Sequence, residues 1–253
     1  MTAMIRALKA ETLKTKRTLA LWLAIITPLG MVGLQFLVVY QRAEYYLRQI
    51  ENAWVRLGQE MFVVFGFLMV PLFVTLQTAL LSSLEHRSDQ WKHLYALPLP
   101  RWTVYAAKQL AGMAVIGLSM MGLVGFSILA GLALRVLKPD MGFDVAIPWD
   151  VFLKYGVMVY LASWLIISLH TWVAMRWRSF VVAMAVGIGM TVGGMVVVNS
   201  EWATFYPWAL PGLLANTFNK GEPILLKELM VSVVGGIVVA LLGCWEVTRR
   251  DVL

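Results

Sequence analysis

Six long stretches of the chain are almost free of charged residues, and polar segments of very different length separate them. The stretches cover residues 18–40, 61–81, 110–134, 155–174, 179–198 and 229–245. A helix needs about 20 mostly apolar residues to cross the hydrocarbon core of a bilayer. The first five stretches meet that length, and the sixth requires snorkelling side chains or a thinner bilayer. Because lipid offers the backbone no hydrogen-bond partners, the pattern predicts an all-α integral membrane protein with six transmembrane helices.

The overall composition agrees with this fold class. Hydrophobic residues make up 60% of the 253 residues, charged residues 14%, and the mean hydropathy is +0.76. Soluble domains contain about 45–50% apolar and about 25% charged residues. The single cysteine, Cys244, excludes a disulfide-rich secreted scaffold. The first apolar stretch is longer than the core of a signal peptide and no small-residue cleavage site follows it, so we expect it to be retained.

The basic residues are spread unevenly over the polar segments and predict an orientation. With a cytoplasmic N-terminus, 13 of the 21 Lys and Arg residues lie on the inside and 8 outside, whereas 5 acidic residues lie inside and 9 outside. Basic residues favour the cytoplasmic side of a membrane protein. We therefore expect both termini in the cytoplasm. The net charge of +7 is then a signal of topology, which argues against a nucleic-acid partner.

The leader, residues 1–17, precedes the first apolar stretch and has its own periodicity. Apolar residues such as Met4, Ile5 and Leu8 recur at helical spacing among five Lys and Arg residues. This pattern predicts an amphipathic helix that lies in the cytoplasmic interface. The alternative is an ordinary basic anchor for the first span.

The longest predicted cytoplasmic segment, residues 82–108, is far longer than a connection between two spans requires. Ser82 and Glu85 have the spacing of a helix start, and a short polar helix is predicted before Pro98 and Pro100 break the chain. We interpret this segment as a docking element, the alternative being a solvated loop with interfacial aromatic residues. The side chains that could contact a partner are Glu85, His86, Arg87, Asp89, Gln90, Trp91, Lys92 and His93.

A second unusual segment, residues 199–228, separates the last two spans on the outer side. It is too apolar for a free loop, and Pro207, Pro211 and Pro223 interrupt it. Apolar helices that are too short to cross predict a re-entrant or interfacial hairpin in the outer leaflet. An aromatic belt with Trp202 and Trp208 at the headgroups is compatible with the same segment.

This order of elements resembles the permease subunits of type-two ABC exporters, and most closely the lantibiotic-immunity and related peptide- or drug-efflux permeases. The outer hairpin and the loop between spans 2 and 3 carry the likeness. In that family the loop forms the coupling helix, which sits in a cleft of the ATPase subunit. The residues of the loop that match by spacing are Glu85, Trp91, Lys92, Pro98, Arg101 and Lys108.

The resemblance implies a multi-pass chain of the cytoplasmic (inner) membrane that forms one permease domain over residues 1–253. It implies two copies of an ABC ATPase subunit, which would bind ATP and Mg²⁺, and a second permease subunit that is identical or paralogous. Spans 2 and 5 would line the dimer interface. An amphipathic peptide, a drug or a lipid would be the cargo. This chain itself would bind no cofactor.

The chemistry of the chain agrees with a partner that supplies the energy. No phosphate-binding loop of the form GxxxxGK[ST] occurs. A short basic turn between spans 4 and 5, with Arg176 and Arg178, is a second candidate contact with the ATPase. Span 2 offers neutral candidates for lining the pathway, namely Pro71, Thr75, Gln77 and Thr78, and Pro71 is also a candidate hinge.

Two other function classes were compared with this one. An intramembrane enzyme is disfavoured because His86, His93 and His170 form no HExxH motif and no GxSxG turn occurs, so we expect no catalytic or metal site. A channel or secondary carrier stays open as the alternative. Proton-coupled carriers usually have an ionisable group deep in the membrane, whereas the centres of these six spans hold only neutral polar residues.

Overall fold

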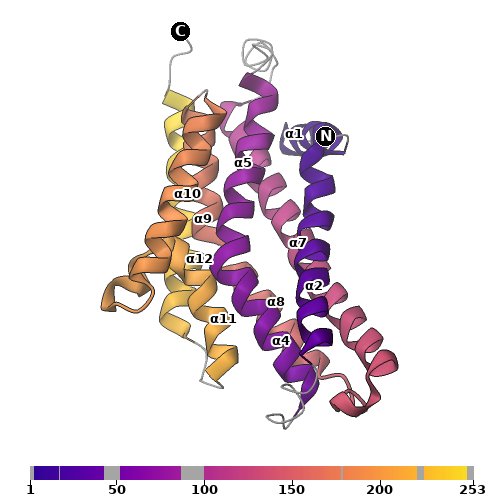
Figure 1. Ribbon diagram of the computed structural model, residues 1–253. Coiled ribbons are helices and arrows are strands. Elements are labelled where there is room, and N and C mark those ends of the chain that lie inside the picture. The colour runs from indigo at the N-terminus through magenta and orange to yellow at the C-terminus, as the bar shows by residue number, and fades with distance from the viewer. Residues whose placement is uncertain are drawn as a thin grey trace.

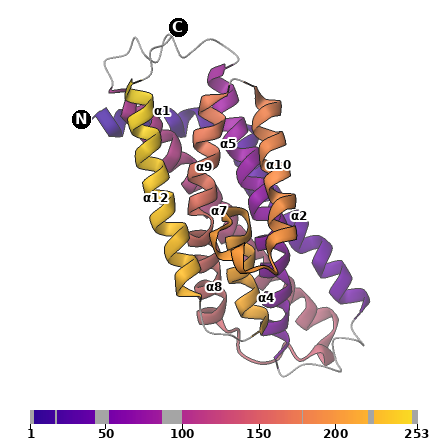
Figure 2. The same cartoon turned by 90° about the vertical axis from the view of Figure 1, so that its left-hand side faces the viewer.

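The computed structural model describes residues 3–16, 18–42, 52–86, 100–177, 179–220 and 225–249. Within these ranges all regular structure is helical, and six helical units are long and apolar enough to cross a membrane. Figures 1 and 2 show them as one elongated bundle in which α1 and the C-terminal end of α12 lie at the same end. The predicted fold class is therefore confirmed. We call this end of the bundle the terminal end and the other the far end.

The six spanning units follow one another along the chain, separated by connections of very different length. They are α2 (Leu19–Gln41), the continuous α4–η1–α5 (Ala53–Val64, Phe65–Met69 and Val70–His86), α7 (Arg101–Leu137), α8–α9 (Trp149–Ala162 and Trp164–Arg176), α10 (Phe180–Val197) and α12 (Leu226–Arg249). Several extend well beyond the apolar stretches of the sequence. The longest, α7, has 37 residues.

Local sequence signals explain where some of these helices begin. The side chain of Asn52 accepts hydrogen bonds from the backbone of Trp54 and Val55, which caps α4. Pro100 precedes α7, as the predicted chain break requires. The predicted helix start at Ser82 is wrong, because α5 runs through it to His86. A serine inside a helix can return its hydroxyl to an earlier carbonyl, as Ser83 does to Leu80 over 2.8 Å.

Span 2 contains a turn of π-helix, η1, between α4 and α5. The backbone N–H of Val70 bonds to the carbonyl of Phe65 across this wider turn. The next residue is Pro71, which has no N–H to donate and whose ring would clash with the carbonyl of Phe67 in a regular helix. The π turn thus accommodates the proline without ending the span.

The outer hairpin folds as three short helices between α10 and α12: η3 (Glu201–Phe205), η4 (Pro207–Ala209) and α11 (Leu210–Lys220). These are the predicted proline-broken helices. α11 packs against α4, α8 and η1, and Leu210, Leu214 and Ala215 are fully buried. Glycines permit the close crossing with span 2: a Cβ on Gly66 would lie 2.8 Å from the carbonyl oxygen of Pro211, and one on Gly212 would overlap Phe67.

Large aromatic side chains fill the core at the far end. Trp54 is fully buried and packs edge-to-face on Phe143, with ring centroids 5.2 Å apart. Its Nε1–H donates to the carbonyl oxygen of Phe143 over 3.2 Å. The ring lies directly against Gly131 of α7, where any Cβ would overlap it. Phe62 and Phe152 extend this cluster toward the middle of the bundle.

Candidate functional site

The predicted coupling segment connects the ends of α5 and α7 at the terminal end (Figure 1). Glu85 and His86 lie in the last turn of α5. The other predicted contact residues, Arg87, Asp89, Gln90, Trp91, Lys92 and His93, lie outside the described residues. The first turn of α7 is closed by Thr103, whose hydroxyl donates to the carbonyl of Pro100 over 2.6 Å.

A buried charged group joins these two helix ends to the leader. The leader forms α1 (Ala3–Thr15), which lies across the other helices and packs against α7 (Figure 2). Lys108 of α7 is only 2% exposed. Its Nζ donates to the carbonyl of Leu81 over 3.0 Å and lies 3.4 Å from a carboxylate oxygen of Glu11. Glu11 also accepts a hydrogen bond from Lys14 over 2.9 Å. Through the two contacts of Lys108, α1, α5 and α7 share one network.

Burial of the Lys108–Glu11 pair both costs and contributes free energy of folding. Taking two charges out of water is costly, and the cost is repaid only when geometry and further hydrogen bonds are good. The two charged residues at its centre are almost completely enclosed, at 2% and 4% exposure for Lys108 and Glu11. We expect such a pair to fix the relative position of the elements that carry it more than it adds stability. The sequence alone places Lys108 in a polar connecting segment and does not indicate its partner, which lies 97 residues away.

The second candidate contact lies at the same end. The guanidinium of Arg176 donates to a carboxylate oxygen of Glu246 in α12 and lies 5.8 Å from the centre of the Trp172 ring. Trp172 donates to the other oxygen of Glu246. Arg176 is exposed, and it forms an ion pair with α12. Arg178 lies outside the described residues. Their contact with an ATPase stays a prediction.

The candidate pathway residues of span 2 are buried within the chain itself. Gln77 donates to the carbonyl of Ala20 in α2 over 2.8 Å. Thr78 returns its hydroxyl to Val74 over 2.8 Å. Thr75 donates to Pro71 over 2.8 Å, next to the π turn. In this single chain Gln77 therefore joins span 2 to α2, whereas these bonds of Thr75 and Thr78 return to their own helix. The role of all three in a pathway stays a prediction.

A polar junction in the middle of the bundle was not predicted. His170 of α9 is fully buried. Its Nε2 accepts a hydrogen bond from Trp208 over 3.2 Å and lies 3.2 Å from the hydroxyl of Thr75. Three segments far apart in the sequence, α5, α9 and the outer hairpin, meet at this ring. From the sequence alone, His170 is a helix-end residue near the cytoplasm, because nothing in one sequence pairs it with a tryptophan of the hairpin.

Glycines of α10 make room for this junction. A Cβ on Gly187 would overlap Thr75, and one on Gly194 would lie 3.3 Å from Trp208. The spacing of Gly189 and Gly193 suggests a small-residue contact in span 5. In the structure Gly193 faces the hydroxyl of Tyr206, whereas a Cβ on Gly189 would meet nothing within 4 Å.

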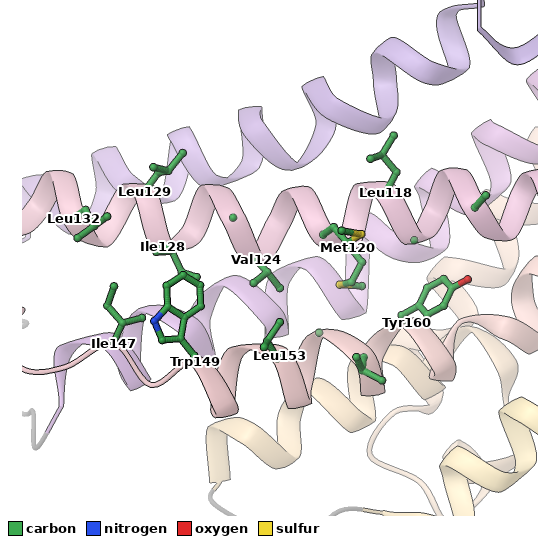
Figure 3. Close-up of a pocket in the computed structure, with 16 residues that line it drawn as sticks. Leu118, Met120, Val124, Ile128, Leu129, Leu132, Ile147, Trp149, Leu153 and Tyr160 are labelled. Atoms are coloured by element: carbon green, nitrogen blue, oxygen red, sulfur yellow. The ribbon is translucent and has the colours of Figure 1, made fainter.

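An apolar groove of about 900 Å³ runs along the surface between α7 and α8 (Figure 3). We call it the α7–α8 groove and define it by Leu118, Met121 and Leu129 of α7 and Trp149, Leu153 and Val157 of α8. These side chains come from two antiparallel helices joined at the far end. Nothing in the pattern of one span predicts such a groove, because it depends on how two spans diverge.

No group of three His, Cys, Asp or Glu side chains in the described part of the chain could hold a metal ion. A family model described as ABC-2 family transporter protein matches residues 7–194, from α1 nearly to the end of α10. Comparison with curated proteins and with solved structures gives no significant match. The family match includes the leader, the coupling segment and the first five spans. Because it covers most of the chain, this multi-pass membrane protein belongs to the ABC-2 family of transporters.

Proposed function

We propose that this chain is the permease subunit of an ATP-driven exporter and is coupled to its ATPase through residues 85–93. Membership of the ABC-2 family implies association with an ABC ATPase subunit. The observation that carries the proposal is the arrangement around the coupling segment. Both helices that flank it end at the terminal end of the bundle, where the Lys108 network fixes them to each other and to α1.

This arrangement supports a mechanical form of coupling. A force on the coupling segment would act on the ends of α5 and α7 together, because Lys108 bonds both to α5 and to α1. Along span 2 the displacement would next reach Pro71 and the π turn, where Gly66 contacts the outer hairpin. Movement of packed helices of this kind can switch a pathway between inward and outward access. ATP and Mg²⁺ would bind to the ATPase subunit.

The complete exporter would contain two ATPase subunits and a second permease subunit, identical or paralogous, in the cytoplasmic (inner) membrane. The basic residues of the chain favour cytoplasmic termini, which would place the coupling segment beside the ATPase. The likeness of residues 85–108 to lantibiotic-immunity and efflux permeases favours an amphipathic peptide as cargo, with a drug or a lipid as the other candidates.

The coupling role is tested by replacing Glu85, Trp91 and Lys92 together with alanine in the co-expressed complex. We expect the variant to insert normally but to lose co-purification with the ATPase and stimulation of ATP hydrolysis. A matched control replaces a glutamate, a tryptophan and a lysine with alanine at exposed positions elsewhere, namely Glu201, Trp202 and Lys227. Normal co-purification and turnover in the first variant would contradict the coupling role.

The partner itself is tested by purifying the tagged chain from its host in mild detergent and identifying the proteins recovered. A stoichiometric partner with a GxxxxGK[ST] loop would support the exporter. Recovery of the chain without any ATPase, under conditions that preserve ABC complexes, would instead favour the channel or secondary carrier.

The hinge at Pro71 has its own test. Replacement by alanine restores a backbone N–H beside the π turn and removes the clash that a regular helix would suffer. We expect Pro71→Ala to leave assembly intact and to change transport-linked ATP turnover. Unchanged turnover would exclude Pro71 as a hinge.

A further inference from the structure

The α7–α8 groove is an unusual surface even for a membrane protein. Most of the side chains that define it are more than half exposed, with Met121 at 74% and Leu153 at 55%. Gly125 also lines the groove, and a Cβ placed on it would meet nothing within 4 Å. Figure 3 shows Trp149 at one end of the groove and Tyr160 at the other, with aliphatic side chains between them. A volume of about 900 Å³ is at the upper end of ligand-binding pockets.

The length of the groove matches one leaflet of a bilayer. Trp149 and Tyr160 are separated by eleven residues of α8–α9, which at 1.5 Å per residue is about 16 Å. The hydrocarbon core of a bilayer is about 30 Å thick, so one leaflet contributes about 15 Å. Because α7 and α8 belong to units long and apolar enough to span a membrane, we expect lipid to surround the groove. An acyl chain that runs parallel to the helices therefore fits its length and chemistry.

The two ends of the groove differ as the two ends of a lipid do. At the inner end the hydroxyl of Tyr160 donates to the carbonyl of Met113 over 3.1 Å, so this polar group is already paired. At the outer end Trp149 is half exposed, and tryptophan favours the level of the headgroups. The groove thus offers a purely apolar surface deep in the leaflet and an interfacial aromatic residue at its mouth.

The charges near the mouth indicate which headgroup fits. The described residues of the connection between α7 and α8 and of the adjoining helix ends carry two basic and three acidic side chains, all exposed or half-exposed. They are Arg135, Lys138, Asp140, Asp144 and Asp150, of which Arg135 and Asp144 pair with each other. A mouth without excess positive charge gives no net attraction for an anionic headgroup. A zwitterionic headgroup can present its phosphate to a basic side chain and its ammonium group to an acidic one.

We propose that the α7–α8 groove is a binding site for a zwitterionic phospholipid. One acyl chain lies between Trp149 and Tyr160, and the headgroup lies among the mixed charges at the far end of the bundle. The bound lipid is a resident of the permease and need not be its cargo. The site does not rest on the proposed coupling to an ATPase, so either can fail without the other.

The test uses the full chain in vesicles of equal parts phosphatidylethanolamine and phosphatidylglycerol. The probe is a trace of phosphatidylethanolamine with a diazirine at the end of one acyl chain, and adducts are mapped by mass spectrometry after irradiation. We expect adducts to concentrate on the groove near Leu118 and Tyr160. Unlabelled phosphatidylethanolamine added in excess should suppress them, and phosphatidylglycerol should not.

Filling the groove provides the matched comparison. Gly125→Leu should lower the yield of groove adducts about tenfold, since the new side chain displaces methylene groups that contribute most of the binding. Gly33→Leu adds the same side chain to α2 at another exposed position with nothing within 4 Å of a Cβ, and should leave the yield unchanged. If Gly125→Leu does not fold, Val157→Trp fills the groove from α8.

Three results would overturn the proposal. Adducts spread over the exposed faces of α2, α10 and α12 and insensitive to Gly125→Leu would mean ordinary surrounding lipid. Equal suppression by the two phospholipids would rule out recognition of a zwitterionic headgroup. Efficient crosslinking between two chains through a cysteine at position 121, in place of lipid adducts, would mean that a second copy of the protein covers the groove.

Discussion

The terminal end and the far end of the bundle are held together by different interactions. At the terminal end, α1, α5 and α7 meet at Lys108 and Glu11, and α9 meets α12 at Glu246. At the far end, α4 and the segment after α7 meet through the rings of Trp54 and Phe143. The first set of contacts depends on charged groups with fixed partners, and the second on the fit of large apolar side chains.

The difference shows how one bundle can define the positions of its helices by charge at one end and by close apolar packing at the other. A charged pair has one favourable geometry and gains little net stability, so it defines position. Aromatic packing gains free energy with the area that it buries and with close fit. The charged end is also where the coupling segment begins and ends, so the elements expected to receive force are joined by position-defining contacts.

The largest expected change in the free energy of unfolding comes from removing Lys108 at the terminal end. Lys108→Met leaves the carboxylate of Glu11 and the carbonyl of Leu81 without their buried partner. We expect the free energy of unfolding, measured by denaturant titration in micelles, to fall by about 3–5 kcal/mol. Adding Glu11→Leu should restore most of this loss, because replacing a whole buried pair with apolar groups is often neutral. A loss below about 1 kcal/mol for Lys108→Met would contradict a position-defining role.

A somewhat smaller effect is expected at the far end. Gly131→Leu places a side chain where the Trp54 ring lies, and overpacking of this kind typically costs about 1–3 kcal/mol. Gly33→Leu is the control on an open face of α2. The same unfolding measurement applies, together with the fluorescence of Trp54 in a variant that retains only this tryptophan. An unchanged free energy of unfolding would mean that the far end is loosely packed.

A smaller loss in the free energy of unfolding is expected at the polar junction around His170, between the two ends. Trp208→Phe removes the hydrogen bond to His170 but keeps the contact of His170 with Thr75. We expect a loss of about 0.5–1.5 kcal/mol in the free energy of unfolding. His170→Phe breaks both contacts and should cost more. Equal losses in the two variants would show that Thr75 contributes nothing to the junction.

The smallest effect is expected for an exposed pair at the far end. Arg135 lies 3.3 Å from Asp144, and both side chains are about half exposed or more. Arg135→Ala should change the free energy of unfolding by about 0–1 kcal/mol, and high salt should remove the difference. A loss as large as that of Lys108→Met would contradict the assignment of charge-dependent structure to the terminal end.

The number and type of the spans could be predicted because hydrocarbon leaves the backbone one solution for each apolar stretch. The prolines of residues 199–228 likewise indicated short helices where η3, η4 and α11 lie. The helix boundaries were harder to predict from the sequence, since α7 begins nine residues before its apolar stretch. Polar residues such as Lys108 and Gln109 fit into its buried face once their partners on other helices are in place.

The candidate site could be predicted only as a segment of the chain, and its contacts with distant residues could not be predicted. Spacing predicts a docking element at residues 85–93, but a single sequence does not say which distant side chains meet. Lys108 bonds to a residue of the leader, and His170 bonds to a residue of the hairpin 38 positions away. Both contacts depend on the packing of helices, which hydropathy and periodicity along one chain do not encode.

The π turn in span 2 has a consequence for the direction in which each half of the span faces. Successive residues of an α-helix are rotated by about 100°, so one extra residue in a turn shifts the angular phase of everything beyond it. The half before the turn packs against α8 and α11, and the half after it packs against α9 and α10. Deleting one residue between Phe65 and Met69 would remove the wider turn and rotate Thr75 away from His170. Span 2 therefore serves two sets of neighbours because its two halves are out of phase.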